Sequence, residues 1–405
     1  MNNKDDCQCP DNCQWTALMW ACHFGEPAKV SRLVQEAGLD INYQDERGIT
    51  AAYWASKQSQ TECVRVLAET GRVDWNKRNK WGETPLFVAL TRGDSDIVEI
   101  IVEQPNIDYN VKTEYGVTLA QAAVRFGGVK CVETLVALES FDCWNVPDSD
   151  GDTPIRMAIV ENQTEILKIL LRCPRVDPGV VSANGETAAI RATMQGEIEC
   201  VRILAQTDRV DWNKTDNHGH TPLYWALLSG QSDIVDIIMQ QPNIDYNVKN
   251  CASYTLGHAA VSGGYVKCVE TLAAKESFDS WNVPDYQGNT AVKMALSIRT
   301  EMAEILLRCP RVNLDAVDTD MKHLEENYFI DDNDFIKNQL WTFRTVQQRM
   351  ILRDSLLTRQ AGSVLSLQSL SRDAVLLREM TLSDNSSQRV RLLVDMTPKE
   401  ILKFL

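Results

Sequence analysis

Cysteines and one histidine near the start of the chain are the residues whose types and spacing could do chemistry. Cys7, Cys9 and Cys13 lie in the segment MNNKDDCQCPDNC, and Cys22-His23 follows. Several thiolates and an imidazole in so short a stretch could hold a zinc ion. Cys-x-Cys is not the usual spacing of a zinc knuckle, however, and Cys22-His23 falls at the end of an expected helix. We therefore favour free thiols and predict no metal site.

No other residues form a catalytic pattern. The sequence holds five histidines, and none lies in a triad or a metal-ligand arrangement. The pairs Gly127-Gly128 and Gly263-Gly264 are expected in turns between helices rather than in phosphate-binding loops. The sequence therefore predicts a protein that is not an enzyme and that needs no cofactor.

The composition restricts the location and the partners. The 405 residues carry a formal net charge of −15, which disfavours nucleic acid and anionic membranes and favours a basic protein or peptide. The first residues lack the apolar core of a secretory signal, and no stretch approaches the length of a membrane span. We expect a cytoplasmic protein, with the nucleus as the alternative, whose cysteines are reduced.

Similar segments of the sequence recur every 34 or 35 residues, for example GETPLFVAL at Gly82 and GHTPLYWAL at Gly219. A threonine that can cap a helix precedes a proline at the first helical position, and an amphipathic second helix follows. Two short helices and a loop tip cannot bury an apolar face alone, so the units must stack. Nine units are expected, and they begin near residues 14, 48, 82, 116, 151, 185, 219, 253 and 288.

A longer period of 137 residues lies above the short one. QPNIDYNVK occurs at Gln104 and again at Gln241. This repetition indicates that a block of four units has been duplicated, so we expect residues 48–184 and 185–321 to contain the same helices. Tryptophans at a fixed place in alternate units are expected to pack between units: Trp75, Trp144, Trp212 and Trp281.

The units resemble the ankyrin-repeat family, whose signature G-x-T-P-L-H-x-A-A and D-[VI]-N element match GETPLFVAL and VDWN. The resemblance covers residues 14–317 and implies an all-α ankyrin-repeat solenoid that binds other proteins. His258 keeps the histidine of the signature. Other residues stand at that position in five further units: Phe87, Arg156, Ile190, Tyr224 and Lys293.

The family usually binds its ligands on the concave face formed by the loop tips and the ends of the inner helices. Large aromatic residues beside arginines are typical of binding hot spots, although aromatics could also pack on one another and stabilise the tips. His218 and His220 flank a loop-tip glycine and are expected to be solvated. The alternative is that they make a pH-sensitive contact with a partner. The expected partner-binding residues are Lys80, Trp81, Glu83, Arg92, Tyr115, Arg125, Phe126, Asp150, Asp152, His218, His220, Tyr254 and Tyr286.

The repeat pattern ends near residue 317. An acidic and then helical linker is expected over 318–362, and a helical tail over 363–405. The tail resembles a SOCS box, which implies that the protein is the substrate receptor of a cullin-RING ubiquitin ligase. The expected contacts are Leu367, Leu370, Ser371 and Val375 with elongin B/C, and Pro398, Ile401 and Leu405 with cullin 5.

Two alternatives to the SOCS box stay open. The segment TPKEILKFL also resembles the opening of an F-box. The tail could instead only cap the last repeat. In that case the protein is a scaffold, adaptor or inhibitor without a ligase contact.

Overall fold

A computed structural model describes residues 15–148, 151–298, 300–309 and 311–313 of the chain. Within these ranges the molecule consists of helices and loops without a strand, apart from one isolated bridge between Lys112 and Thr118. The chain divides after Val248 into two compact units, unit 1 and unit 2. The predicted all-α solenoid is confirmed, whereas the predicted C-terminal tail lies outside the described residues.

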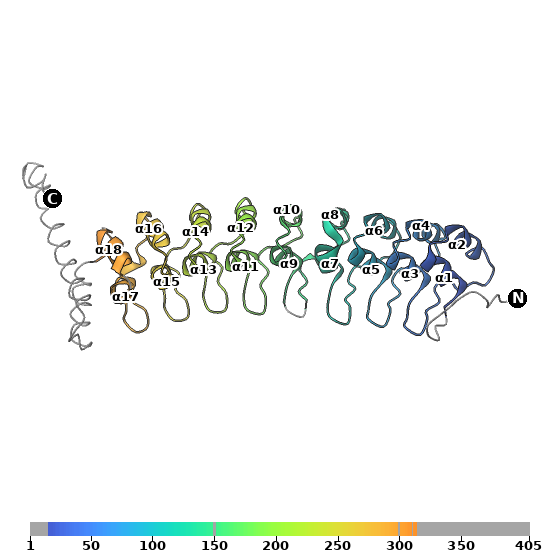
Figure 1. The fold of residues 1–405 in the computed structure, drawn as a ribbon, viewed down its shortest axis with the longest axis horizontal. Coiled ribbons are helices and arrows are strands. Elements are labelled where there is room, and N and C mark those ends of the chain that lie inside the picture. Colours follow the sequence, from blue (N-terminus) through green and yellow to red (C-terminus); the bar gives the residue numbers. More distant parts are fainter. Residues whose placement is uncertain (1–14, 149–150, 299, 310, 314–405) are drawn as a thin grey trace, which may run out of the picture. The chain divides into compact units, whose positions relative to one another are not determined.

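Unit 1 contains seven helix pairs in the part of it that the structure describes (Figure 1). The first helix of each pair is an inner helix, and the second is an outer helix. The inner helices are α1 (Ala17–Phe24), α3 (Ala51–Lys57), α5 (Pro85–Arg92), α7 (Leu119–Ala122), α9 (Pro154–Val160), α11 (Ala188–Gln195) and α13 (Pro222–Leu228). The outer helices are α2 (Pro27–Leu33), α4 (Thr61–Glu69), α6 (Ser95–Val102), α8 (Gly128–Ala137), α10 (Thr164–Arg172), α12 (Ile198–Ala205) and α14 (Ser232–Met239).

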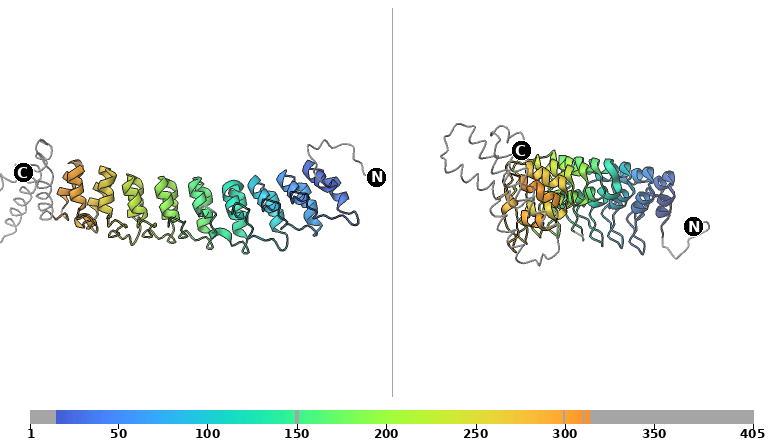
Figure 2. Two further views of the ribbon diagram at one scale, coloured as in Figure 1. Left: turned by 90° about the horizontal axis from the view of Figure 1, so that it is seen from below. Right: turned by 60° about the vertical axis from the view of Figure 1, so that its left-hand side comes forward.

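Unit 2 repeats this design in two further pairs. They are formed by α15 (Leu256–Gly263) with α16 (Val266–Ala274), and by α17 (Ala291–Ile298) with α18 (Thr300–Arg308). Short 3₁₀ helices follow the outer helix at the same place in the fourth and eighth repeats, η2 (Cys143–Asn145) and η3 (Ser280–Asn282). Figure 2 shows the succession of pairs within each unit from two further directions.

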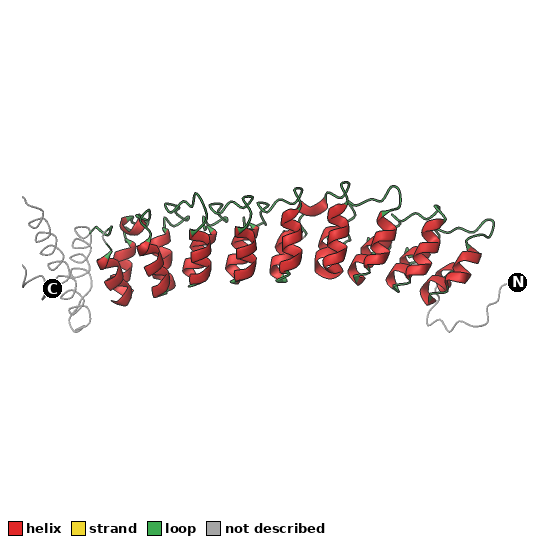
Figure 3. Ribbon diagram, turned by 90° about the horizontal axis from the view of Figure 1, so that it is seen from above, coloured by secondary structure: helices red, strands yellow, loops and turns green. Residues whose placement is uncertain are grey.

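Local sequence signals set the ends of the helices. In the third repeat, Thr84 Oγ1 accepts a hydrogen bond from the backbone N–H of Phe87, and Pro85 occupies the first helical position. Gly93 then ends α5 with a φ of 73°, a left-handed conformation that glycine adopts without steric cost. Within each unit, the long loops that join successive repeats gather along one edge of the helix pairs (Figure 3).

The core lies between neighbouring pairs and is made of small and aliphatic residues. Leu86 and Leu90 of α5 are fully buried, as are Ile97 and Val98 of α6. The predicted burial of the repeated tryptophans is confirmed at all four positions. Burial of this kind supplies most of the stability of a repeat array, because an isolated pair leaves one face open to water.

Within the described ranges, the two duplicated blocks contain the same number of α-helices in the same order, α3–α10 and α11–α18, as the duplication predicts. They differ in the fourth repeat, where a π-helix, η1 (Ala123–Gly127), follows α7. Gly127 stays helical with a φ of −74°, and Gly128 instead takes the positive φ of 72°. In the eighth repeat the corresponding residue, Gly264, is itself left-handed. The sequence pattern predicted that Gly127 lies in a turn between helices. This prediction is wrong for Gly127, which belongs to the π-helix.

Arginines that come a few residues after an outer helix reach back to the preceding repeat. Their side chains donate hydrogen bonds to carbonyl oxygens near the end of the outer helix of that repeat. Arg209 donates to the carbonyl oxygens of Leu171 and Cys173 at 2.9 and 3.0 Å. Arg72 and Arg175 make similar bonds in unit 1, and Arg311 makes one in unit 2. Carbonyl groups at the C-terminal end of a helix lack helical partners and carry partial negative charge, so a guanidinium there satisfies both needs.

The position of the signature histidine also links repeats. In unit 2, His258 Nε2 lies 2.9 Å from the carbonyl oxygen of Asn289 in the next repeat. In the fourth repeat Gln121 replaces the histidine, and its Nε2 donates to the carbonyl oxygen of Asp152 at 2.8 Å. The amide of Gln121 thus makes the same kind of contact with the next repeat as the signature histidine does.

Candidate partner-binding surface

One open hollow of about 480 Å³ lies in unit 1 between the second, third and fourth repeats. Four of the predicted partner-binding residues line it: Trp81, Glu83, Arg92 and Tyr115. We call it the aromatic hollow. Its complete lining is Tyr53, Lys57, Gln58, Trp81, Glu83, Val88, Thr91, Arg92 and Tyr115.

The backbone that carries Trp81 is held by hydrogen bonds. The side-chain oxygen Oδ1 of Asn79 accepts from the backbone N–H groups of Trp81 and Glu83, both at 2.9 Å. The carbonyl oxygen of Trp81 accepts from the backbone N–H of Glu114 in the next tip at 3.0 Å. Gly82 has a φ of 77°, and a Cβ there would lie 3.1 Å from the backbone of that next tip. The tips are thus fixed before any partner arrives.

The aromatic hollow carries two cations and one carboxylate. The Lys57 ammonium lies 5.7 Å from the centroid of the Tyr53 ring and 5.4 Å from that of Trp54. Within the described part of the chain, neither Lys57 nor Arg92 forms an ion pair. Glu83 is already engaged, because its Oε2 accepts from the Tyr53 hydroxyl at 2.6 Å and from Asn79 at 2.8 Å. Burial, with the Glu83 contact second, raises the pKa of Tyr53, so the phenol stays neutral.

An aromatic cluster that sequence reasoning missed adjoins Trp54. The rings of Trp15 and Trp54 lie 4.4 Å apart, and the Trp20 and Phe24 rings stack at 5.5 Å. His23 also packs against the Trp54 ring, at 4.9 Å. Burial, helped by the nearby Lys57, lowers the pKa of His23. The signal was present in the segment WTALMWACHF, where His23 and Phe24 follow Trp20 by three and four residues, the spacing at which helical side chains meet.

Arg125 and Phe126 lie on the π-helix and are both exposed. The Arg125 guanidinium is 5.5 Å from the centroid of the Phe126 ring, and its Nε lies 3.9 Å from Glu161. These two residues do not line the aromatic hollow. They present a second arginine and aromatic pair on the repeat next to it. Lys80, at the tip of the third repeat, is exposed as well.

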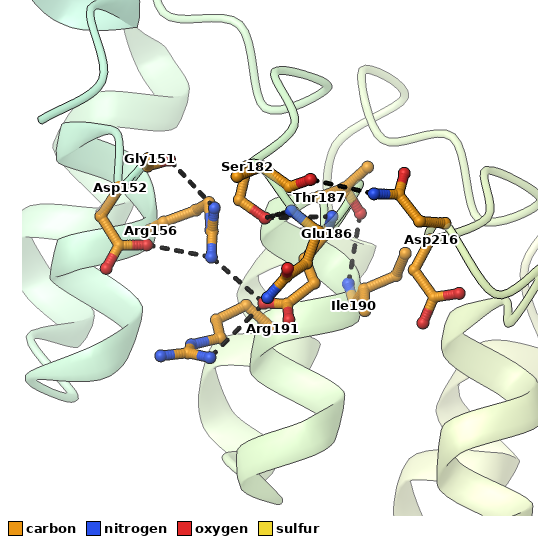
Figure 4. Close-up of polar contacts among 12 residues, drawn as sticks. Gly151, Asp152, Arg156, Ser182, Glu186, Thr187, Ile190, Arg191 and Asp216 are labelled. Carbon is orange, nitrogen blue, oxygen red and sulfur yellow. Dashed lines mark hydrogen bonds and ion pairs between the residues drawn. The ribbon is translucent and has the colours of Figure 1, made fainter. Parts of the chain in front are cut away.

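Asp152 belongs to a buried ionic network (Figure 4). Its carboxylate lies 2.9 Å from Nη2 of Arg156, whose side chain is only 3% exposed. The same Nη2 donates to Glu186 of the next repeat at 3.1 Å, and Arg191 also pairs with Glu186, at 3.4 Å. Burial lowers the pKa of Arg156 and the two carboxylates oppose that effect. Asp152 is thus occupied within the protein. Asp150 lies outside the described residues.

His218 and His220 lie at the tip of the seventh repeat, as expected. His218 is exposed, whereas the His220 ring stacks on Tyr224 at 4.4 Å and lies 3.3 Å from Asp216. Burial alone would raise the pKa of Asp216. Hydrogen bonds from the backbone of His220 and His218 and from the indole of Trp225 lower it by more. This tip is therefore a packed cluster, and the exposed His218 ring lies at its edge, 5.8 Å from the ring of His220.

The remaining predicted residues are dispersed. In unit 2, Tyr254 is half-buried and stacks on His258, whereas Tyr286 is 67% exposed. The residues predicted to contact elongin and cullin all lie outside the described residues: Leu367, Leu370, Ser371, Val375, Pro398, Ile401 and Leu405.

The described residues contain no group of three or more His, Cys, Asp or Glu side chains that could hold a metal ion. Cys7, Cys9 and Cys13 lie outside them. Burial raises the pKa of Cys63 and Cys200 to about 11, so both thiols stay protonated and unreactive. No helix in the described ranges is long and apolar enough to cross a membrane.

Stacked helix pairs with loop tips fixed on one edge define the class of the molecule, an α-helical repeat solenoid. The family model described as "Ankyrin repeats (3 copies)" matches residues 1–72, 18–113, 71–143 and 155–250, more than half of the chain. The protein belongs to the ankyrin-repeat family.

Comparison with solved structures agrees on the fold. The model is similar to the crystal structure of the ankyrin repeat domain of Bcl-3, described as a unique member of the IkappaB protein family. The TM-score is 0.50 at 21% sequence identity, and the match covers 56% of this chain and 99% of that one. At this identity the likeness shows the fold alone. No curated protein matches the sequence significantly.

Proposed function

We propose that this protein is a non-catalytic binding protein that recruits a protein partner at the aromatic hollow. The observation that carries this proposal is the combination of exposed aromatic rings and unpaired cations on a fixed backbone. Trp81 is 39% exposed and Tyr115 is 72% exposed. Membership of the ankyrin-repeat family supports a binding role. The absence of a catalytic pattern in the sequence favours it over an enzymatic one.

The physical reason is that fixed tips reduce the entropy lost on binding. A partner that docks on Trp81 and Tyr115 buries apolar surface that is already held in place by the Asn79 turn and its neighbours. Tryptophan, tyrosine and arginine are the residues that most often dominate binding energy when they surround a pocket. The aromatic hollow contains all three.

Co-purification from cell lysate with the full chain tests the proposal. The double variant Trp81→Ala/Tyr115→Ala should lose most of the bound partner. Ser229→Ala, at the matching inner helix of the duplicated block, should retain it. Equal recovery of the partner by the wild-type chain and both variants would contradict the proposal. Thermal melting of each variant serves as the control for folding.

We further propose a role as the substrate receptor of a cullin-RING ubiquitin ligase, acting in the cytoplasm or nucleus. This proposal is supported only by the resemblance of residues 363–405 to a SOCS box. The change Leu367→Asp would put a charge into an apolar elongin pocket and should abolish elongin pull-down, while partner binding at the repeats should persist. If the wild-type chain recovers no elongin, the alternative of a scaffold, adaptor or inhibitor with a capping tail is favoured.

A further inference from the structure

We infer that the partner presents to the aromatic hollow an acidic side chain next to an aromatic or large aliphatic one. The natural ligand of this site is then an acidic peptide segment with an apolar anchor. This inference rests on the proposed function, which places the partner at the hollow. It differs from the expectation based on net charge, which favours a basic partner.

The charges at the hollow are the first observation. Lys57 and Arg92 form no ion pair among the described residues, although the chain as a whole carries a net charge of −15. A nearby surface lysine behaves differently, because Lys130 pairs with Asp96 at 3.0 Å and Glu99 at 3.5 Å. Two cations left unpaired in one hollow of an acidic protein indicate that the missing carboxylates come from a partner.

The single carboxylate of the hollow, Glu83, forms no ion pair with either cation among the described residues, and one carboxylate against two cations leaves the hollow positive. Both neighbours of Glu83, the Tyr53 hydroxyl and the Asn79 amide, donate to the same oxygen Oε2. Glu83 therefore serves to orient the Tyr53 ring, over which the Lys57 ammonium lies. A carboxylate that enters the hollow meets Lys57 and Arg92 as charge-assisted donors.

The aromatic walls supply the second part of the recognition. Trp81 and Tyr115 stand on adjacent tips and line the same hollow as the two cations. An apolar side chain placed between them would bury surface without leaving a polar group unpaired, whereas a basic side chain would meet like charges at Lys57 and Arg92. The site thus selects for an acidic and an apolar residue close together.

The duplicated block offers a matched control within the same chain. Its residues at the positions of Lys57, Trp81, Arg92 and Tyr115 are respectively Met194, His218, Ser229 and Ala252. The copy has therefore neither the two cations nor the two aromatic rings of the hollow. Two glutamates introduced there, at Met194 and Ser229, change the net charge by −2. Replacing Lys57 and Arg92 by glutamine changes it by the same amount, but only the second variant alters the aromatic hollow.

Selection from a random peptide library displayed on phage tests the inference, with the full chain as bait. Peptides that need the hollow are those whose binding falls at least tenfold on Trp81→Ala/Tyr115→Ala. We expect these peptides to carry Asp or Glu within a few residues of Trp, Phe, Tyr or Leu. Their binding should weaken as salt is raised.

Removal of the two cations then separates the possible outcomes. Lys57→Gln/Arg92→Gln should reduce the binding of these peptides at least tenfold, while Met194→Glu/Ser229→Glu, with the same change in net charge, should leave it unchanged. Peptides that need the hollow but are basic or uncharged would overturn this inference and leave the proposed function standing. If no selected peptide depends on Trp81 or Tyr115, both the inference and the proposed function are contradicted. Circular dichroism of each variant confirms that it folds.

Discussion

Residues 48–184 and 185–321 have kept most of the buried residues of their outer helices but have diverged at the positions of the aromatic hollow. The residues buried in the first three outer helices of the first block are the same in the second block, for example Cys63 and Cys200, or Ile97 and Ile234. In the last outer helix Met302 and Ala303 replace Ile166 and Leu167. Of the residues that line the aromatic hollow, only Gln58 has the same type in the copy. Stacking constrains the buried side chains because each contacts two repeats. The exposed face has no such constraint, so each block can present its own surface.

The fourth and eighth repeats show a second contrast, in the turn between their two helices. The left-handed glycine of the fourth repeat, Gly128, comes one position later in the repeat than Gly264 does in the eighth. The π-helix lies directly before Gly128 and includes Gly127. The exposed pair Arg125 and Phe126 belongs to this π-helix.

The largest expected effect tests the shared core. Trp144 and Trp281 are fully buried, each against a phenylalanine ring less than 5 Å away. Trp144→Ala and Trp281→Ala should each reduce the free energy of unfolding of the surrounding repeats by about 3–5 kcal/mol. Hydrogen exchange of the adjacent helices measures the loss. A loss in only one block would show that the two cores are not equivalent.

The buried ionic network should give the next largest effect. Arg156→Ala leaves Glu186 without its main partner in a buried site, which should cost about 3–5 kcal/mol. Lys293 stands at the matching position of the second block and is only half-buried. Lys293→Ala should therefore cost less. Urea denaturation followed by circular dichroism compares the two variants, and equal losses would mean that burial of the charge is not the cause.

The hollow should matter for binding rather than for stability. Trp81→Ala should weaken partner binding by about 1–3 kcal/mol. The melting temperature should stay nearly unchanged, because the Trp81 ring is partly exposed. The Asn79 side chain bonds to the backbone N–H of residue 81, which an alanine there keeps. Calorimetric titration with a selected peptide and a thermal melt provide both readings. A steep fall in the melting temperature would favour the alternative that the tip aromatics are structural.

The smallest expected effect concerns pH in the eighth repeat. Burial lowers the pKa of His258, against the opposing effects of the Asn289 carbonyl and Asp285. The unfolded histidine, with a pKa of about 6.5, therefore takes up a proton first as the pH falls. The stabilisation that neutral His258 gives to the folded state is fully present above the unfolded pKa. It is lost progressively as the pH falls from there to the lowered pKa of the folded state.

His258→Gln copies the residue of the fourth repeat and should remove this pH dependence. At pH 7 it should change the stability by less than about 1 kcal/mol, because Gln121 makes the equivalent bond in its own repeat. Hydrogen exchange at pH 5 and pH 7 checks both statements. If the pH dependence of the stability is unchanged in this variant, a titratable group other than His258 causes it.

The sequence predicted the repeats, their order and the capping residues, because threonine, proline and glycine act locally. It did not predict the π-helix. Which glycine of the fourth repeat becomes left-handed depends on packing, since a Cβ at Gly127 would lie 3.0 Å from that of Cys131. It also missed Lys57 and Tyr53, which contribute to the hollow only once the second and third repeats are stacked. Equal spacing along the sequence does not reveal which side chains meet across repeats.

The arginines that reach back to the preceding repeat have a consequence for a chain under tension. Arg72, Arg175 and Arg209 each join two successive repeats of unit 1 through carbonyl oxygens. When the protein is stretched from its ends, repeats should detach one after another. Joints that contain such an arginine should rupture at higher force than joints without one. Unit 1 would then yield in steps of unequal strength, and these three side chains would influence its order of rupture.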